Sequence, residues 1–330
     1  MNPNARLAAL AVVVLTGSVA CESTITGNEG NFQFSYPADD RVLDFNKPIA
    51  IGAKLDLQVR DAGDRTPITL TGATTGDESV LVVDSFEGDM LTISAVGDGN
   101  TTVDVKGTTQ AGLEQTDSVN MLARTPEVHI LRHTCDYDSN SAAYLAGQQV
   151  YVPFEFTMAD TQPVIGYGYY PVTPSDPNVL SLDATFQGSQ YMRFDTLTTG
   201  SITLDSDITD TRLTMEVVEA GAIDGVQDPI AFVGEDIDVG DVNPFYVRPK
   251  VGTNVVCQAI TGLQVASDTP DICDVRPATN LSGAQTDTGN EPGWFEVEGV
   301  AEGTCTYTVT FTAGAAGAGV SAQFSYPIQP

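Results

Sequence analysis

The fold of this chain is decided by the stretch Gly293–Val309, which reads G-W-F-E-V-E-G-V-A-E-G-T-C-T-Y-T-V. Apolar and polar residues alternate on both sides of a turn at Gly303. Strict alternation is typical of a half-buried β-strand, and glycine suits a tight turn because it tolerates a positive φ. We therefore predict two strands joined by a short turn, each with one face on a core and one face in water.

The same outline occurs twice more, in Met90–Val105 and in Tyr191–Leu204, and each copy follows a polar turn and another short apolar run. The turn glycines fall at Gly99, Gly200 and Gly303, at intervals of 101 and 103 residues. This spacing is close to the roughly 100 residues of an immunoglobulin-type sandwich. Long stretches with helical periodicity do not occur in the sequence, so we predict an all-β chain of tandem immunoglobulin-like β-sandwich domains.

Two of these stretches carry a family resemblance. V-E-G-V-A-E-G-T-C-T-Y-T-V (residues 297–309) and S-D-P-N-V-L-S-L-D with T-T-G-S-I-T-L (residues 175–183 and 198–204) resemble bacterial immunoglobulin-like domains of group two, the invasin and intimin type. The resemblance covers the C-terminal half of each repeat. It implies the sandwich fold and says little about function, because sandwiches host many functions.

The chain has 330 residues, which is more than one ordinary core accommodates. The second copy of the repeat differs most from the common outline, because a Tyr-rich stretch stands where a loop is expected. The predicted divisions are a signal peptide (1–20), a lipidated tether (21–31), a first Ig-like domain (32–124), a second, divergent one (125–218) and a third (219–330).

The first twenty residues have the parts of a secretory signal. Arg6 supplies a positive charge, Leu7–Leu15 is apolar, and the small-x-small exit Ser18–Ala20 precedes Cys21. Ser-Val-Ala-Cys also resembles a lipobox, in which a diacylglycerol joins the cysteine thiol, although the usual lipobox has Leu where Ser18 stands. Ordinary cleavage after residue 20 and an uncleaved apolar segment are the alternatives.

The lipobox implies a lipoprotein, with palmitate among its acyl chains and the lipid bilayer as a partner through the anchor at Cys21. Glu22 follows this cysteine, whereas an Asp there would hold many enterobacterial lipoproteins in the inner membrane. The resemblance therefore implies an exported protein anchored in the cell outer membrane or at the cell surface. No later apolar stretch approaches the roughly 20 residues needed to span a bilayer.

The charge of the chain is strongly negative. The whole chain carries 14 basic and 44 acidic residues, a formal charge of −30, and loss of residues 1–20 would remove Arg6 and no acid, leaving −31. Nucleic-acid binding depends on basic residues that neutralise phosphates, so we predict no nucleic-acid partner. The acid excess is typical of a solvated surface.

Five cysteines stand at positions 21, 135, 257, 273 and 305. If Cys21 carries lipid, four remain, and even counts suit disulfides in an exported protein. The repeat outline places Cys273 and Cys305 in one sandwich, so this pair is predicted first. A bridge from Cys257 to Cys273 or to Cys305 is the rival, and Cys135 then needs a partner across a domain junction.

His129 and His133 form H-x-x-x-H-x-C with the next cysteine. On a strand the two histidines would lie about 13 Å apart, too far for one metal ion, so we predict ordinary strand residues and no metal or other cofactor. Asp136–Asn140 begins like a calcium loop, but Ser141 and Gly147 occupy the places of the required Gly and acid. A looser cation site there stays open.

No enzymatic template fits the sequence: two histidines leave few ways to build a triad, and the nucleophile-elbow, zincin and phosphate-loop motifs do not occur. We therefore predict a non-enzyme. A cell-adhesion or binding module for a protein or glycan is the first hypothesis, and a structural spacer without a ligand is the second. Aromatic residues are enriched at binding hot spots, which makes four residues candidates for contact, with core packing as the alternative reading: Tyr167, Tyr169, Tyr170 and Trp294.

Overall fold

The computed structural model describes residues 24–36, 47–135, 141–227, 230–231, 237–258, 263–278, 294–312 and 319–330. These residues form strands and turns, with one 3₁₀ turn at Ala220–Ala222. Within these ranges there is no α-helix, and no segment of them forms a helix long and apolar enough to cross a membrane. The predicted all-β fold of tandem immunoglobulin-like sandwiches is confirmed.

The first sandwich packs a five-stranded sheet, in the order β1-β2-β4-β7-β6, against a four-stranded sheet, β3-β9-β8-β5. Alternation places apolar side chains inward: in β4, Leu55, Leu57 and Val59 are buried while the residues between them are half-buried. Part of the predicted tether pairs with β2 as β1. The strands are β1 (Thr24–Thr26), β2 (Phe32–Ser35), β3 (Ile49–Ala50), β4 (Lys54–Asp61), β5 (Thr69–Thr75), β6 (Leu81–Glu87), β7 (Met90–Ala95), β8 (Gly99–Thr108) and β9 (Glu114–Arg124).

The second sandwich packs the sheet β10-β12-β16-β15, with β13 also on β12, against β14-β17-β18-β11. The second of these sheets continues beyond β11 through β24, β23 and β19, which follow later in the sequence. The strands are β10 (Val128–Leu131), β11 (Ser141–Leu145), β12 (Gln149–Thr157), β13 (Pro163–Val164), β14 (Val172–Pro174), β15 (Leu180–Leu182), β16 (Tyr191–Thr196), β17 (Gly200–Ser206), β18 (Arg212–Val218), β19 (Gly225–Val226), β23 (Pro249–Val251) and β24 (Asn254–Cys257).

The third sandwich repeats the plan, with β20-β22-β27-β26 on one side and β21-β29-β28-β25 on the other. In each of the three sandwiches the closing strand pairs in parallel with a short strand at the edge of that sandwich's own part of the sheet, namely β3, β11 or β21. The strands are β20 (Ile230–Ala231), β21 (Ile237–Asp238), β22 (Val242–Tyr246), β25 (Leu263–Ser267), β26 (Cys273–Pro277), β27 (Trp294–Gly299), β28 (Gly303–Phe311) and β29 (Val320–Gln329).

The three glycines of the repeat each begin a strand, as β8, β17 and β28 start at Gly99, Gly200 and Gly303. The structure adds a reason for glycine that the turn alone did not supply. A Cβ at these positions would lie 2.7 Å from the side chain of Val80, 3.0 Å from that of Val179 and 3.0 Å from that of Ile272. Each glycine therefore allows its turn to pack closely against a branched side chain of the neighbouring turn. The same packing contact occurs in all three sandwiches.

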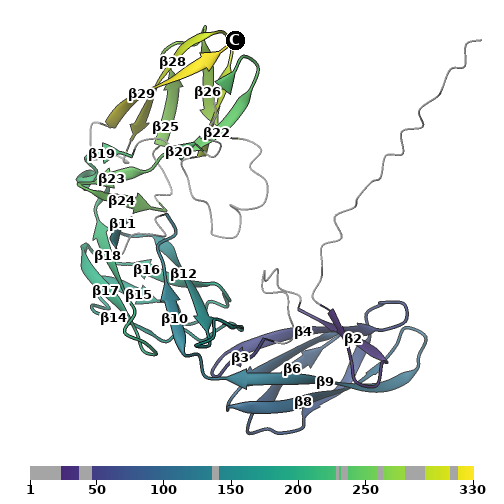
Figure 1. Cartoon of the computed structure of the whole chain (residues 1–330). Coiled ribbons are helices and arrows are strands. Elements are labelled where there is room, and N and C mark those ends of the chain that lie inside the picture. The colour runs from purple at the N-terminus through teal and green to yellow at the C-terminus, as the bar shows by residue number, and fades with distance from the viewer. Residues whose placement is uncertain are drawn as a thin grey trace, which may run out of the picture.

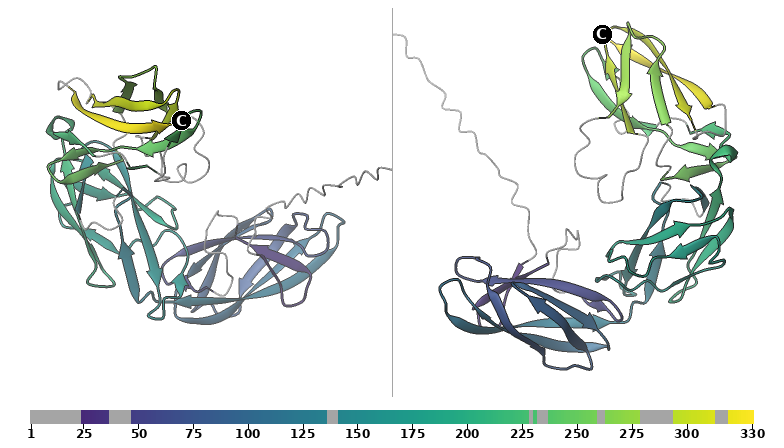
Figure 2. Two further views of the ribbon diagram at one scale, coloured as in Figure 1. Left: turned by 45° about the horizontal axis from the view of Figure 1, so that its top comes forward. Right: turned by 180° about the vertical axis from the view of Figure 1, so that it is seen from behind.

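The three sandwiches follow one another in a curved array, and residue 330 lies at the end of the third sandwich that is farther from the second (Figure 1). Two further views show the same succession from other sides (Figure 2). One cluster of buried side chains runs through the first and second sandwiches. The third sandwich has its own core, and a smaller cluster that includes Leu145 and Phe311 bridges it to the second.

The Cys273–Cys305 bridge is present, with the two Cα atoms 5.5 Å apart. It joins β26 of one sheet to β28 of the other, and both cysteines are fully buried. The bridge therefore ties the two layers of the third sandwich together, because neither sheet can move away from the other while it holds.

We expect the double variant Cys273→Ser/Cys305→Ser to lose about 3–4 kcal/mol of unfolding free energy in the third sandwich, the chain-entropy value for a loop of this length. Trp294 is the chain's one tryptophan and lies in this sandwich, so its fluorescence during guanidinium unfolding reports the change locally. The control is Cys135→Ser/Cys257→Ser, which leaves this bridge intact. An unchanged midpoint in the first variant would contradict the assignment.

Candidate functional site

The first and second sandwiches are joined through residues 158–171, the loop after β12, which we call the first docking segment. Its Ile165 carbonyl accepts a hydrogen bond from the backbone N–H of Ala50, in β3, at 2.9 Å. Two residues on, Tyr167 and Lys54 exchange both backbone hydrogen bonds, at 2.8 and 2.9 Å. The loop thus extends the edge of the first sandwich as a short added strand.

Two of the predicted aromatic contact residues lie in this junction. The Tyr167 hydroxyl donates to the carboxylate of Asp56 at 2.9 Å, and burial together with that carboxylate raises the pKa of the phenol above its usual value. The ring of Tyr169 lies against Gly52, where a Cβ would stand 2.8 Å from the ring and where φ is +94°. Gly52 is therefore required both by the turn and by the ring above it.

The third tyrosine of the stretch stays within the second sandwich. The Tyr170 hydroxyl lies 2.8 Å from the carbonyl oxygens of Phe186 and Gly188, and its ring meets Phe154 edge-on. Sequence reasoning found the tyrosines but missed their partners Asp56 and Gly52, since no local pattern marks a contact more than 100 residues away. The proposed contact of these tyrosines with a ligand stays a prediction.

The second and third sandwiches are joined through residues 247–258, which we call the second docking segment. Its strand β24 pairs in parallel with β11, with Ala143 opposite Val256 and Tyr144 opposite Cys257. A disulfide links Cys257 to Cys135, 122 residues earlier. The rival pairings of Cys257 with Cys273 or Cys305 are not formed, and Cys135 finds its partner across the junction.

Gln258 completes this junction. It is buried and its backbone has φ of 51°, a conformation that costs a non-glycine residue about 1–2 kcal/mol. Its side-chain oxygen accepts from the N–H of Tyr151 at 2.8 Å, and its amide nitrogen donates to the Tyr151 carbonyl and to the Thr134 hydroxyl, each at 2.7 Å. These hydrogen bonds offset the backbone strain and fix the segment on the second sandwich.

The outer face of the third sandwich carries Trp294, the fourth aromatic candidate. Its ring lies 4.9 Å from that of Tyr246 on the neighbouring strand, and the guanidinium carbon of Arg248 stands 4.3 Å from the centre of the Tyr246 ring. Trp294 is half-buried. The buried Arg248 thus supports the Tyr246 ring from below, and two neighbouring half-buried rings are a surface that suits an apolar or aromatic ligand group.

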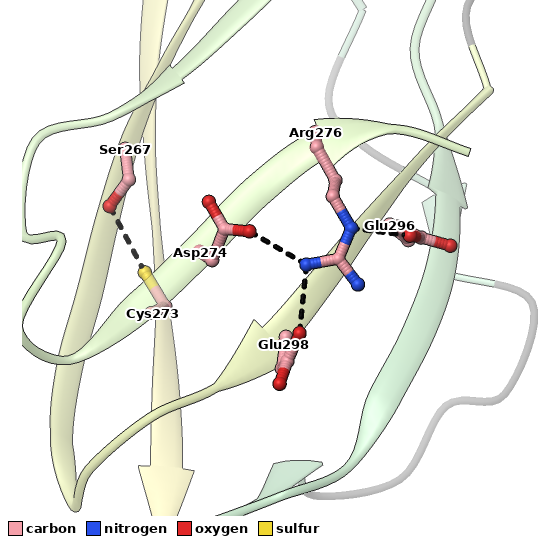
Figure 3. Close-up of polar contacts among 6 residues, drawn as sticks. All are labelled: Ser267, Cys273, Asp274, Arg276, Glu296 and Glu298. Carbon is pink, nitrogen blue, oxygen red and sulfur yellow. Dashed lines mark hydrogen bonds and ion pairs between the residues drawn. The ribbon is translucent and has the colours of Figure 1, made fainter. Parts of the chain in front are cut away.

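The same sheet holds a charge cluster around Arg276 (Figure 3). The guanidinium lies 2.6 Å from the carboxylates of Asp274 and Glu296 and 2.8 Å from that of Glu298. The hydrogen bonds that the guanidinium donates to these carboxylates raise the pKa of the arginine. Since three carboxylates surround one cation, the cluster leaves this face negatively charged.

Both histidines are fully buried. His129 Nδ1 lies 2.9 Å from the Ser206 hydroxyl, its ring packs 4.7 Å from that of Phe156, and burial lowers its pKa to about 4. His133 Nδ1 lies 2.9 Å from the Tyr144 hydroxyl. Both are thus held in packed surroundings by hydroxyl partners. No group of three or more His, Cys, Asp or Glu in the described part of the chain is arranged to hold a metal ion.

A cleft of about 310 Å³ lies on the first sandwich, over β5, β8 and β9. The buried carboxylate of Asp117 borders it and accepts hydrogen bonds from the backbone N–H groups of Glu29, Asn31 and Phe32 at 2.7–2.8 Å. The carboxylate is therefore committed to holding the β1–β2 turn in place. Cys21 and the calcium-like stretch Asp136–Asn140 lie outside the described residues.

Comparisons with known proteins find likeness only among solved structures. No family model matches the chain, and no curated protein matches it. Domains 4–9 of the surface-layer protein SbsC are 16% identical with a TM-score of 0.29, over 93% of this chain and 46% of that one. Invasin, described as a bacterial integrin-binding protein, is 12% identical with a TM-score of 0.21, over 86% of this chain and 59% of that one. The D00-D0 domain of intimin is 10% identical with a TM-score of 0.21, over 60% and 99%.

Burial of His129 makes stability depend on pH. Its pKa is about 4 in the folded chain and about 6.5 when unfolded, so the unfolded state takes up the proton first and stability falls as the pH drops from 6.5 towards 4. We expect this residue alone to remove about 2.5 kcal/mol between pH 7.5 and 4.5. In His129→Gln, urea unfolding at the two pH values should show a correspondingly smaller loss. An equal loss in variant and wild type would contradict the prediction.

Gly52 and Gly240 make a matched pair for the first junction, because both have φ of +94° in equivalent turns. A Cβ at Gly52 would clash with Tyr169, whereas nothing lies within 4 Å of a Cβ at Gly240. Both alanine variants should lose about 1–2 kcal/mol from the backbone. Only Gly52→Ala should also loosen the junction and broaden the distance between spin labels on the first and second sandwiches. Equal distance distributions in both variants would refute the docking role of Tyr169.

Proposed function

We propose that this chain is a cell-envelope lipoprotein whose immunoglobulin-like domains act as an adhesion or binding module. The observation that carries the proposal is the backbone pairing of each docking segment with the preceding sandwich. A chain joined in this way holds its third sandwich at a fixed reach from its first. Fixed reach is useful to a molecule that is anchored at one end and engages a partner at the other.

Stiff junctions favour binding at the far end for a thermodynamic reason. A flexible linker spreads the end domain over many positions, and binding must then restrict that freedom. Here the second junction is closed by a disulfide, a parallel strand pair and the buried side chain of Gln258. The ordering of the domains is therefore completed during folding, before any partner arrives.

The chemistry of the surface supports a protein or glycan as partner. The formal charge of −30 opposes contact with nucleic acid and with anionic lipid headgroups. The half-buried rings of Trp294 and Tyr246 lie side by side on one face of the third sandwich. Aromatic rings bind the apolar faces of sugars and other aromatic side chains, while the carboxylates around Arg276 supply acceptors.

A structural spacer of the envelope, without a ligand of its own, is the second candidate. The stiff junctions favour it equally, since a spacer needs reach and no binding face. A pull-down from envelope lysate with residues 22–330 separates the two proposals. Repeated recovery of one partner supports the binding module, whereas its consistent absence supports the spacer.

The anchor is tested by labelling with radioactive palmitate. We expect wild-type chain to take up label and to fractionate with membranes, because an acyl chain contributes about 0.8 kcal/mol per buried methylene. Cys21→Ala should take up none and stay in the soluble exported fraction, while Cys135→Ser/Cys257→Ser serves as a control that also removes cysteine. Equal labelling of wild type and Cys21→Ala would overturn the lipoprotein proposal.

A further inference from the structure

Both junctions between sandwiches use the same arrangement of strands. In each, a docking segment that follows β12 or β22 of the next sandwich lies parallel to the short edge strand of the preceding one. The first segment places Ile165 beside Ile49 of β3, and the second places Val256 beside Ala143 of β11. The chain thus uses one type of edge, twice, to receive the next domain.

The docking segments also bind the strand that follows the edge strand. Tyr167 pairs with Lys54, the first residue of β4, and Gln258 bonds both backbone groups of Tyr151 in β12. Each receiving end therefore has two parts, the edge strand and the start of the next strand. We call this pair of strands the receiving end, formed by β3–β4 in the first sandwich and by β11–β12 in the second.

The third sandwich has a receiving end of the same construction in β21–β22. Gly240 has φ of +94° and donates to the Gly299 carbonyl at 2.8 Å, as Gly52 does to the Ala95 carbonyl at 2.8 Å. The turns therefore have the same backbone shape. Among the described strands β21 is the terminal one of its sheet, whereas β11 is followed by β24.

Apolar side chains at this receiving end are exposed to solvent. Val239 is 46% exposed and Val242 is 45% exposed. No atom of the described residues lies within 4 Å of a Cβ at Gly240, whereas the ring of Tyr169 occupies that place over Gly52. The N–H of Val239 donates inward to Gln329, so the N–H of the residue before it faces outward along the edge.

We propose that the receiving end of the third sandwich, β21–β22, binds an extended segment of a partner protein that pairs in parallel with β21 and places an aromatic ring over Gly240. The inference rests on the proposed function and specifies where the module binds. The proposal is supported by the chain itself, because the receiving ends of the first and second sandwiches are each covered by an extended docking segment. Strand addition to a sheet edge supplies backbone affinity, and side-chain positions then supply specificity.

The charge of this end defines the partner further. Asp238 and Asp241 are exposed here, where the equivalent residues of the first sandwich are Ala50 and Ala53. Exposed Glu302 lies in the adjacent turn. A segment that carries Lys or Arg beside its apolar and aromatic residues would therefore complement this end, and salt should weaken its binding.

A second copy of this chain is a poorer occupant. Its first sandwich has the loop equivalent to a docking segment at residues 62–68, half the length of 158–171. That loop has no aromatic residue and is closed on itself, with Asp61 N–H donating to Thr66 and Arg65 N–H to Asp61 at 2.9–3.0 Å. It cannot extend along β21 in the way that the first docking segment extends along β3.

The test places a photocrosslinker at the receiving end of the full-length chain in its native envelope. Val239→p-benzoylphenylalanine should crosslink to another protein, at an extended segment with an aromatic residue and a basic neighbour, mapped by mass spectrometry. The control is Leu113→p-benzoylphenylalanine, at an exposed turn of the first sandwich that is 59% exposed. No crosslink above this control, or a crosslink to a second copy of the chain, overturns the proposal.

Binding of the mapped partner, once purified, gives the quantitative test. Val242→Lys and Gly240→Ala should each weaken binding at least tenfold. The first replaces an apolar contact with a positive charge that repels the basic partner segment, and the second places a methyl group under the ring. Leu113→Lys should leave binding unchanged, and circular dichroism confirms that all variants fold. Equal affinity in all three variants overturns the proposal. If adhesion and palmitate labelling persist in Val242→Lys while the Val239 crosslink is absent, the module binds through another face and the proposed function survives.

Discussion

The rest of the structure depends on the unsatisfied backbone groups at the edge of each sheet. A sandwich of two open sheets leaves N–H and C=O groups exposed along its outer strands, and these groups pair with whatever extended chain reaches them. In this molecule the short edge strands β3 and β11 are met by segments of the next domain. The array is therefore held by the same hydrogen bonds that build each sheet.

Side-chain packing makes these junctions permanent. One buried cluster passes through the first two sandwiches, so bending there would expose apolar surface to water. At the second junction the Cys135–Cys257 bridge adds a covalent link over 122 residues of sequence. Packing and a disulfide thus reinforce the junctions of the curved array that Figure 2 shows.

The acid excess is compatible with this plan because most carboxylates lie on the surface or receive hydrogen bonds. The buried Asp117 is the instructive case, since backbone N–H groups satisfy it and it ties the β1–β2 turn to β9. Around Arg276 three carboxylates share one cation. The resulting negative surface favours solubility and repels anionic molecules.

The sequence by itself determined the strands, their turns and the approximate repeat, because alternation with period two and glycine turns are local properties. Gly99, Gly200 and Gly303 fell at strand starts as predicted, and the Cys273–Cys305 pair followed from the repeat. Only the tertiary structure decided that Tyr167 and Tyr169 dock on the first sandwich and that Cys257 reaches back to Cys135. Those contacts join residues more than 100 positions apart. A local sequence pattern does not specify which distant sheet edge a loop will pair with. The physical reason is that strand pairing is specified by neighbours in space, and these neighbours exist only once the sandwiches have folded.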